Sequence, residues 1–220
     1  MARSVYLLVP NLIGYARVLL NVAAFTFAAS FDNRTVFSSM YFTSFALDCI
    51  DGYAARLLKQ TSTFGTVLDM VTDRVATVCL LMLLGASHSP YLPVCLALAS
   101  LDLFSHWFQM YASLVRKKAS HKAIGKDESS LLKLYYNNRP FMGTLCLSAE
   151  LLYLCLYLSL DRQYSAFKLR FVSTSVPLVS VLVYATFPGC ALKQVINIIQ
   201  LKSAADALVA LESPKWPYKR

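Results

Sequence analysis

Four aspartates stand within otherwise apolar sequence: Asp48, Asp51, Asp69 and Asp73. A charged side chain is costly inside a bilayer, so acids in membrane segments indicate function. The first pair has the spacing i, i+3 and the second the spacing i, i+4, so each pair projects from one face of a helix. Two such helices facing each other would place four carboxylates around one small volume. Carboxylates so arranged are the ligands that Mg²⁺ and Mn²⁺ prefer.

Small and basic residues stand at fixed positions around these acids. The segment reads Asp-x2-Asp-Gly-x2-Ala-Arg-x8-Gly-x3-Asp-x3-Asp, which adds Gly52, Ala55, Arg56 and Gly65. Small residues either let membrane helices pack closely or leave room for a bound nucleotide and diphosphate. Arg56 is either a snorkelling charge near a helix end or a ligand for phosphate. For the acids themselves, the alternative to a metal site is a set of helix caps and salt bridges.

This motif resembles the signature of the CDP-alcohol phosphotransferases, and other segments resemble the inositol-using eukaryotic members of that family. Those segments are Pro10-Asn11-Leu-Ile-Gly14-Tyr15-Ala-Arg17, Thr63 to Arg74, Ser105-His106-Trp107, Ser120-His121-Lys122 and Tyr135 to Pro140. The resemblance covers about residues 8–160, and the last third matches in hydropathy more than in motif. It implies an integral membrane enzyme that transfers a phosphatidyl group from CDP-diacylglycerol to myo-inositol and releases CMP.

The resemblance also implies roles for the motif residues. The metal ion, Mg²⁺ or Mn²⁺, would be bound by Asp48, Asp51 and Asp69, with Asp73 as a further ligand. Asp73 would also be the base that takes the proton from the attacking hydroxyl. CDP-diacylglycerol would be bound by Asn11, Gly52, Ala55, Arg56 and Gly65. Asn11 and Arg17 are polar residues of the first apolar segment, which would border the nucleotide; the alternative is that both simply lie near the membrane interface.

Four basic residues are candidates for binding the headgroup alcohol: His106, Arg116, Lys122 and Arg139. Inositol is neutral and rich in hydroxyl groups, so its pocket needs hydrogen-bond donors and acceptors. Histidine in a helix and basic residues in a loop both also have simpler roles in membrane proteins. A lone histidine in an apolar helix is often a satisfied core residue, and basic loop residues often set topology or contact anionic lipid.

The composition is that of a membrane protein. The chain has 220 residues, of which 57% are hydrophobic and 15% charged, against about 25% charged in soluble domains. Its mean hydropathy is +0.51. The net charge of +9 does not indicate nucleic-acid binding, because the basic residues cluster between and after apolar segments. The six cysteines include no CxxC pair, so neither a disulfide framework nor a zinc site is predicted.

The apolar segments predict an all-α membrane bundle, since a spanning helix needs about 20 apolar residues. About six helices are expected, at 5–30, 36–58, 66–87, 90–114, 140–160 and 171–199. The last either extends beyond the bilayer or breaks near Pro188-Gly189. Residues 115–139 form the longest polar connection. We expect a single membrane domain over residues 1–220, with the catalytic motif at 48–73 and a cytosolic tail at about 203–220.

The distribution of basic residues predicts the orientation. They concentrate in the second and fourth connections and in the tail, while the first, third and fifth connections hold few. By the positive-inside rule, both termini and the motif loop face the cytosol. The family resemblance implies the endoplasmic reticulum membrane and a homodimer.

Two other functions are compatible with parts of the sequence. The first is a transferase of the same family that uses glycerol phosphate or serine, because the aspartate motif determines the reaction class and not the alcohol. The second is a membrane cation transporter with acidic helix faces. A transporter would distribute its acids along a membrane path, whereas these four cluster near one side within a frame of Gly, Ala and Arg.

Overall fold

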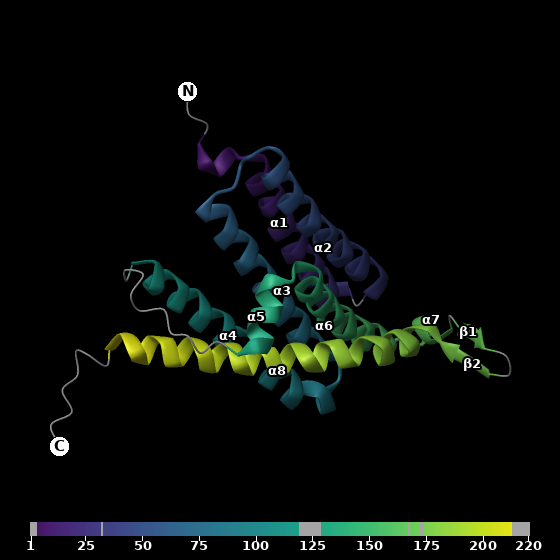
Figure 1. Ribbon diagram of the computed structural model, residues 1–220. Helices are drawn as coiled ribbons and strands as arrows, with labels where there is room; N and C mark the ends of the chain where they lie inside the picture. Colours follow the sequence, from purple (N-terminus) through teal and green to yellow (C-terminus); the bar gives the residue numbers. More distant parts are fainter. Residues whose placement is uncertain (1–3, 32, 119–128, 167, 172–173, 213–220) are drawn as a thin grey trace, which may run out of the picture. The chain divides into compact units, whose positions relative to one another are not determined.

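The structure is a computed structural model (Figure 1) that describes residues 4–31, 33–118, 129–166, 168–171 and 174–212. It divides into two compact units, Met1–Ser87 and His88–Arg220. Helices form most of the described chain, and one short hairpin accompanies them in the second unit.

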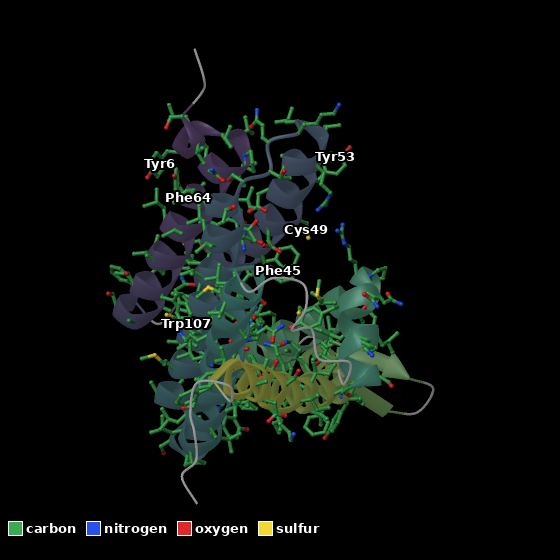
Figure 2. The ribbon with its side chains drawn as sticks, turned by 60° about the vertical axis from the view of Figure 1, so that its left-hand side comes forward. Tyr6, Phe45, Cys49, Tyr53, Phe64 and Trp107 are labelled. Carbon is green, nitrogen blue, oxygen red and sulfur yellow. The ribbon has the colours of Figure 1, made fainter. Side chains whose placement is uncertain are left out.

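The first unit contains a short 3-10 helix, η1 (Val5–Leu7), and three long helices. These are α1 (Val9–Phe31), α2 (Arg34–Leu57) and α3 (Thr63–Ser87). α1 packs along both α2 and α3, and Figure 1 shows α1 and α2 side by side. η1 is tied to the start of α3 by Tyr6 and Phe64, whose ring centroids are 5.1 Å apart with nearly perpendicular planes (Figure 2).

The buried face of α1 is made of polar residues and small residues. It includes Asn11, Gly14, Arg17, Asn21 and Ala24, at helical spacings of three and four residues. Bulkier apolar residues of the same helix, such as Leu19 and Val22, are exposed. This inversion of the usual pattern fits a helix whose outer face meets lipid and whose inner face meets other helices.

Local capping sets the ends of the two acid-bearing helices. Asn33 begins α2, where its side chain accepts a hydrogen bond of 3.1 Å from the Val36 amide. At the other end, Lys59 adopts a left-handed conformation with φ 54°, and the Gln60 amide donates to the Ala55 carbonyl at 2.9 Å. Ser62 then accepts from the Gly65 amide at 2.9 Å as α3 begins. A connection of a few residues therefore joins the two helices.

The second unit is built around a long C-terminal helix. Its elements are η2 (Ser89–Tyr91), α4 (Leu92–Lys118), α5 (Ser130–Asn137), α6 (Arg139–Ser159), α7 (Arg162–Ala166), β1 (Lys168–Phe171), β2 (Thr174–Pro177) and α8 (Leu178–Glu212). α8 packs against α4 and α6. The strands β1 and β2 are antiparallel, with Lys168 opposite Pro177.

α6 and α8 approach each other closely at Gly189. A Cβ at this position would lie 2.5 Å from Ser148 Oγ and 2.6 Å from Ser148 Cβ. Only glycine fits, which is the usual reason for small residues between membrane helices. Beside this contact, an apolar cluster of Leu132, Leu145 and Ile196 joins α5, α6 and α8.

Four helices within the described residues are long and apolar enough to cross a membrane, so the chain is a multi-pass membrane protein. They are Val9–Phe31, Ser89–Val115, Arg139–Ser159 and Leu178–Ala210. α2 and α3 coincide closely with the predicted helices at 36–58 and 66–87, and have 24 and 25 residues. Both carry several charged residues, so the expectation of about six spans stays a prediction.

Two expectations for the elements were wrong, within a described chain that is otherwise helical as predicted. The polar connection 115–139 contains the helix α5, and a two-stranded hairpin interrupts the all-α pattern. Residues 174–177, expected to be helical, form β2: Thr174 and Val176 are β-branched, and Pro177 cannot donate a helical hydrogen bond. Of the two alternatives for the last helix, the structure shows continuation: α8 passes through Pro188 and reaches Glu212. Part of the expected tail is therefore helical, and residues 213–220 lie outside the described residues.

Candidate functional site

The two pairs of aspartates lie together in the first unit. Asp48 and Asp51 come from α2, whereas Asp69 and Asp73 come from α3. One carboxylate oxygen from each of Asp48, Asp51 and Asp69 lies within 4.8 Å of the others. The helical spacing read from the sequence thus produces the expected arrangement, in which acids of two helices face each other.

Arg17 of α1 forms ion pairs with all four acids. Its Nη1 lies 2.8 Å from Asp51 Oδ2 and 2.7 Å from Asp69 Oδ1. Its Nη2 lies 2.6 Å from Asp48 Oδ1 and 2.5 Å from Asp73 Oδ1. Charge-assisted contacts of this kind are shorter and stronger than hydrogen bonds between neutral groups. All three helices of the unit therefore contribute to the cluster.

The cluster has a buried side and an open side. The Arg17 side chain is 3% exposed, whereas those of Asp48 and Asp69 are 31% and 47% exposed. Arg17 supplies one positive charge, and Arg74 lies 4.0 Å from the outer oxygen of Asp73. Four carboxylates against these two arginines leave an excess of negative charge that is accessible from the open side.

The cluster has the chemistry of a divalent-cation site. Its ligands are carboxylate oxygens, which suit hard cations, and those of Asp48, Asp51 and Asp69 converge closely enough to hold one ion. The negative charge that the arginines leave uncompensated favours a cation at the same place. These residues could therefore bind a metal ion.

A cavity of about 200 Å³ adjoins the acids. Asp51 and Asp69 form part of its wall, and so do all five residues predicted to bind the nucleotide: Asn11, Gly52, Ala55, Arg56 and Gly65. The lining also includes Thr61 and Ser62 of the connection between α2 and α3. Residues from three helices thus line one space beside the acidic cluster.

Asn11 and Gly65 meet at the wall of this cavity. A Cβ on Gly65 would lie 2.5 Å from Asn11 Oδ1 and 3.1 Å from Ser62 Oγ, so α1 and α3 approach here only because the side chain is missing. Asn11 is 1% exposed and its Nδ2 donates to the Val5 carbonyl at 2.6 Å. Its Oδ1 has no hydrogen-bond partner among the described residues, which leaves an acceptor for a ligand.

Gly52 differs from Gly65 in its surroundings. A Cβ there would meet only the Arg56 guanidinium, at 3.5 Å, which is ordinary contact. The absence of a side chain at Gly52 therefore leaves space in the cavity and is not required for helix packing.

The headgroup candidates belong to the second unit, and His106 and Arg139 are not among the residues that line the cavity. His106 lies on α4, where its Nδ1 is 2.8 Å from the Asp102 carbonyl and 3.5 Å from Asp102 Oδ1. Arg139 begins α6 and is exposed. Arg116 lies in the last turn of α4. Lys122 lies outside the described residues, and the roles of all four stay predictions.

A row of polar residues on α8 was not anticipated from the sequence. Lys193 is 2% exposed; its Nζ donates to Asn197 Oδ1 at 2.7 Å and lies 5.1 Å from the centre of the Tyr135 ring. Gln200 donates to the Ser105 carbonyl of α4 at 3.0 Å. The sequence does contain a pattern that predicts this row, because polar residues recur every three or four positions within this apolar segment.

The comparisons with known proteins agree on one family. The sequence profile of the CDP-alcohol phosphatidyltransferase family matches residues 7–200. A protein of Arabidopsis thaliana named probable CDP-diacylglycerol–inositol 3-phosphatidyltransferase 2 is 46% identical over 96% of this chain and 94% of its own length. The CDP-diacylglycerol–inositol 3-phosphatidyltransferase of Mus musculus is 39% identical over 96% of this chain and 95% of its own length.

A relative from Schizosaccharomyces pombe with the same name is 38% identical over 95% of this chain and 92% of its own length. No solved structure gives a significant match. The similarity extends through α8, well past the segments whose motifs indicated the family.

Proposed function

The chain belongs to the CDP-alcohol phosphatidyltransferase family, and we propose on this premise that it transfers a phosphatidyl group from CDP-diacylglycerol to myo-inositol. The products are phosphatidylinositol and CMP. The observation that carries the proposal is the similarity, over nearly the full length of the chain, to plant, fungal and animal proteins named for this reaction. The acids and the adjoining cavity supply groups that such a reaction requires.

The reaction exchanges one bond at phosphorus for another. The inositol hydroxyl oxygen bonds to the lipid-linked phosphorus, and the bond from that phosphorus to the bridging diphosphate oxygen breaks as CMP leaves. We assign Asp73 as the base that takes the hydroxyl proton. Its side chain is 34% exposed, so it lies toward the open side of the cluster, where an acceptor can approach.

We assign Asp48, Asp51 and Asp69, with Asp73, as the ligands of Mg²⁺ or Mn²⁺. Their convergence supports this assignment. The bound ion would neutralise the diphosphate and the charge that develops on the leaving phosphate. Positioning and charge neutralisation are the main requirements of phosphoryl transfer, and the convergent carboxylates of α2 and α3 can meet both.

The cavity is the proposed site for the CDP group. The unpartnered Oδ1 of Asn11 can accept a hydrogen bond from a nucleotide amino or hydroxyl group. The Arg56 guanidinium provides paired donors suited to phosphate oxygens. Gly52 and Ala55 keep the space between them free of bulk. These features support the five residues predicted from the sequence as ligands of CDP-diacylglycerol.

The remaining assignments concern the acceptor and the membrane. We propose that His106, Arg116, Lys122 and Arg139 contribute to recognition of inositol. We further propose that α2 and α3 also span the bilayer, giving about six spans, with the active site and both termini in the cytosol and the protein in the endoplasmic reticulum as a homodimer. The distribution of basic residues supports the orientation.

Substitution of Gly65 by alanine is expected to lower kcat/KM for CDP-diacylglycerol by at least about tenfold, a loss of about 1.4 kcal/mol of transition-state stabilisation. The added Cβ would overlap Asn11 Oδ1 at 2.5 Å and displace the wall of the cavity. The measurement is the rate of CMP release against CDP-diacylglycerol concentration in mixed micelles.

Gly143→Ala is the matched control, because a Cβ there meets nothing within 4 Å. It lies within α6, where alanine is the better helix former, and should leave the kinetics unchanged. If the two variants have equal kinetics, the close approach of Asn11 and Gly65 does not contribute to the nucleotide site.

A panel of alcohols tests the proposed function directly. The purified protein, supplied with CDP-diacylglycerol and a divalent cation, is expected to release CMP when myo-inositol is added and not when serine or glycerol phosphate is added. A pocket built to bind several hydroxyl groups discriminates strongly against alcohols that lack them. Preference for serine or glycerol phosphate would overturn the inositol assignment and leave the reaction class intact. Absence of CMP release with every alcohol would overturn the transferase itself.

A further inference from the structure

Arg17 connects the two acid-bearing helices in a specific pattern. Each terminal nitrogen of its guanidinium bridges one acid of α2 and one acid of α3. Nη1 contacts Asp51 and Asp69, while Nη2 contacts Asp48 and Asp73. The planar group thus lies between the helices and uses both ends of its fork.

The third nitrogen of the Arg17 guanidinium, Nε, makes no such contact within the described part of the chain. Nε is buried and has no hydrogen-bond partner among the described residues. An unsatisfied buried donor costs free energy, so the ion pairs at Nη1 and Nη2 must offset that cost. Each ion pair uses one oxygen of its aspartate.

We propose that Arg17 is the resident counterion of the acidic cluster. It stabilises the metal-free protein by offsetting repulsion among the four carboxylates, and it opposes the divalent cation that binds to the same carboxylates. This inference rests on the proposed metal site. Arginine keeps its charge in proteins at any ordinary pH, so the opposition cannot be relieved by loss of a proton. Its function would be to hold the acids of α2 and α3 together beside α1 before a cation is bound and to limit the affinity for that cation.

A purely structural role for Arg17 gives the opposite expectation. If the guanidinium only held the carboxylates in place, its removal would let them separate and metal binding would weaken. If it is a competing charge, its removal lowers the repulsion felt by an incoming cation, and metal binding becomes tighter. The sign of the change in metal affinity therefore distinguishes the two roles.

The test uses Mn²⁺ as the probe and the full-length protein in detergent, without lipid substrate or inositol. Free Mn²⁺ is counted by electron paramagnetic resonance, and the melting temperature is measured with and without the ion. For Arg17→Met we expect the Kd for Mn²⁺ to fall at least about tenfold, equivalent to about 1.4 kcal/mol. We also expect a lower melting temperature without metal and a larger rise on adding Mn²⁺ than in the unsubstituted protein.

Two further substitutions at Arg17 separate the effect of its charge on Mn²⁺ binding from the effect of its shape. Arg17→Gln is neutral and should also bind Mn²⁺ more tightly, whereas Arg17→Lys keeps the charge and should stay near the unsubstituted affinity. Arg162→Met is the control, because Arg162 is exposed on α7 and outside the cluster; its Kd should not change. If the neutral variants unfold without metal, the expected result is that Mn²⁺ restores their folding.

Unchanged or weaker Mn²⁺ binding in both neutral variants would overturn the counterion role, and so would failure of Mn²⁺ to restore folding. Absence of Mn²⁺ binding by the unsubstituted protein would overturn both this inference and the proposed metal site. The assignment of inositol is untouched by any of these results, because no acceptor is present in the measurement.

Discussion

Asp73→Asn is expected to lower turnover by about 10²–10⁴-fold, the range that positioned general acid-base groups contribute, while CDP-diacylglycerol still binds. Asparagine keeps the shape of the side chain but cannot take a proton as a carboxylate does. Asp73 has arginines on two sides, Arg17 at one oxygen and Arg74 4.0 Å from the other. The measurement is CMP release and lipid binding on the same preparation.

The control for Asp73→Asn is Asp206→Asn. Asp206 is an exposed acid of α8 paired with Lys202 at 2.8 Å, and exposed pairs of this kind contribute little to stability. Near-normal turnover of Asp73→Asn would remove the base assignment. Loss of CDP-diacylglycerol binding together with turnover would make Asp73 principally a metal ligand.

Removal of the metal is the second change with a large expected effect. Dialysis against a chelator should abolish CMP release, and readdition of Mg²⁺ or Mn²⁺ should restore it.

Asp51→Asn should lower activity by at least about 10²-fold at the cation concentration that saturates the unsubstituted protein, because Asp51 is the most buried of the four acids, at 10% exposure. Loss of one carboxylate removes both a ligand and a negative charge from the site.

Asp48→Asn and Asp69→Asn should behave in the same way, since these residues converge with Asp51. The measurement is the cation concentration that gives half-maximal activity for each variant, with Asp206→Asn as the control. Full activity after exhaustive chelation would overturn the metal mechanism, and unchanged activity of Asp51→Asn would exclude that residue from the ligands.

The sequence predicted the parts of the site that depend on local geometry. The spacings of Asp48 with Asp51 and of Asp69 with Asp73 determine which helix face each pair occupies, and a short connection brings those faces together. Of the five residues predicted to bind the nucleotide, four come from the same motif and Asn11 comes from the resemblance of the first segment; all five line the cavity. Apolar length located α1, α2, α3, α4 and α6 to within about four residues at each end, because membrane spans are set by bilayer thickness. It did not locate α8, which begins and ends later than expected.

Arg17 illustrates what the sequence does not predict. Its partners lie 31 to 56 residues away in the sequence, from Asp48 to Asp73, so their contact depends on how α1 packs against α2 and α3. The helical row of buried polar and small residues on α1 identifies the inner face of that helix. It does not identify which side chains of the other helices Arg17 meets. The resemblance suggested only that this helix borders the nucleotide.

The errors in the second unit have a related cause. α5 has eight residues and the strands have four each, too short for periodicity to distinguish them from polar loops. Pro188 left a break and a continuation both open, and α8 continues, since membrane helices tolerate proline where neighbouring groups satisfy the freed backbone. The adjoining Gly189 is a point of close approach to α6.

The position of Arg17 in the chain bears on how the protein enters the membrane. Synthesis proceeds from the N-terminus, so α1 is made before α2 and α3. A charged residue at the centre of an isolated membrane helix costs about 2.5–3.5 kcal/mol on insertion. Arg17 therefore reaches the membrane before the four acids that it pairs with. The acidic helices can then insert beside a positive charge that is already in place.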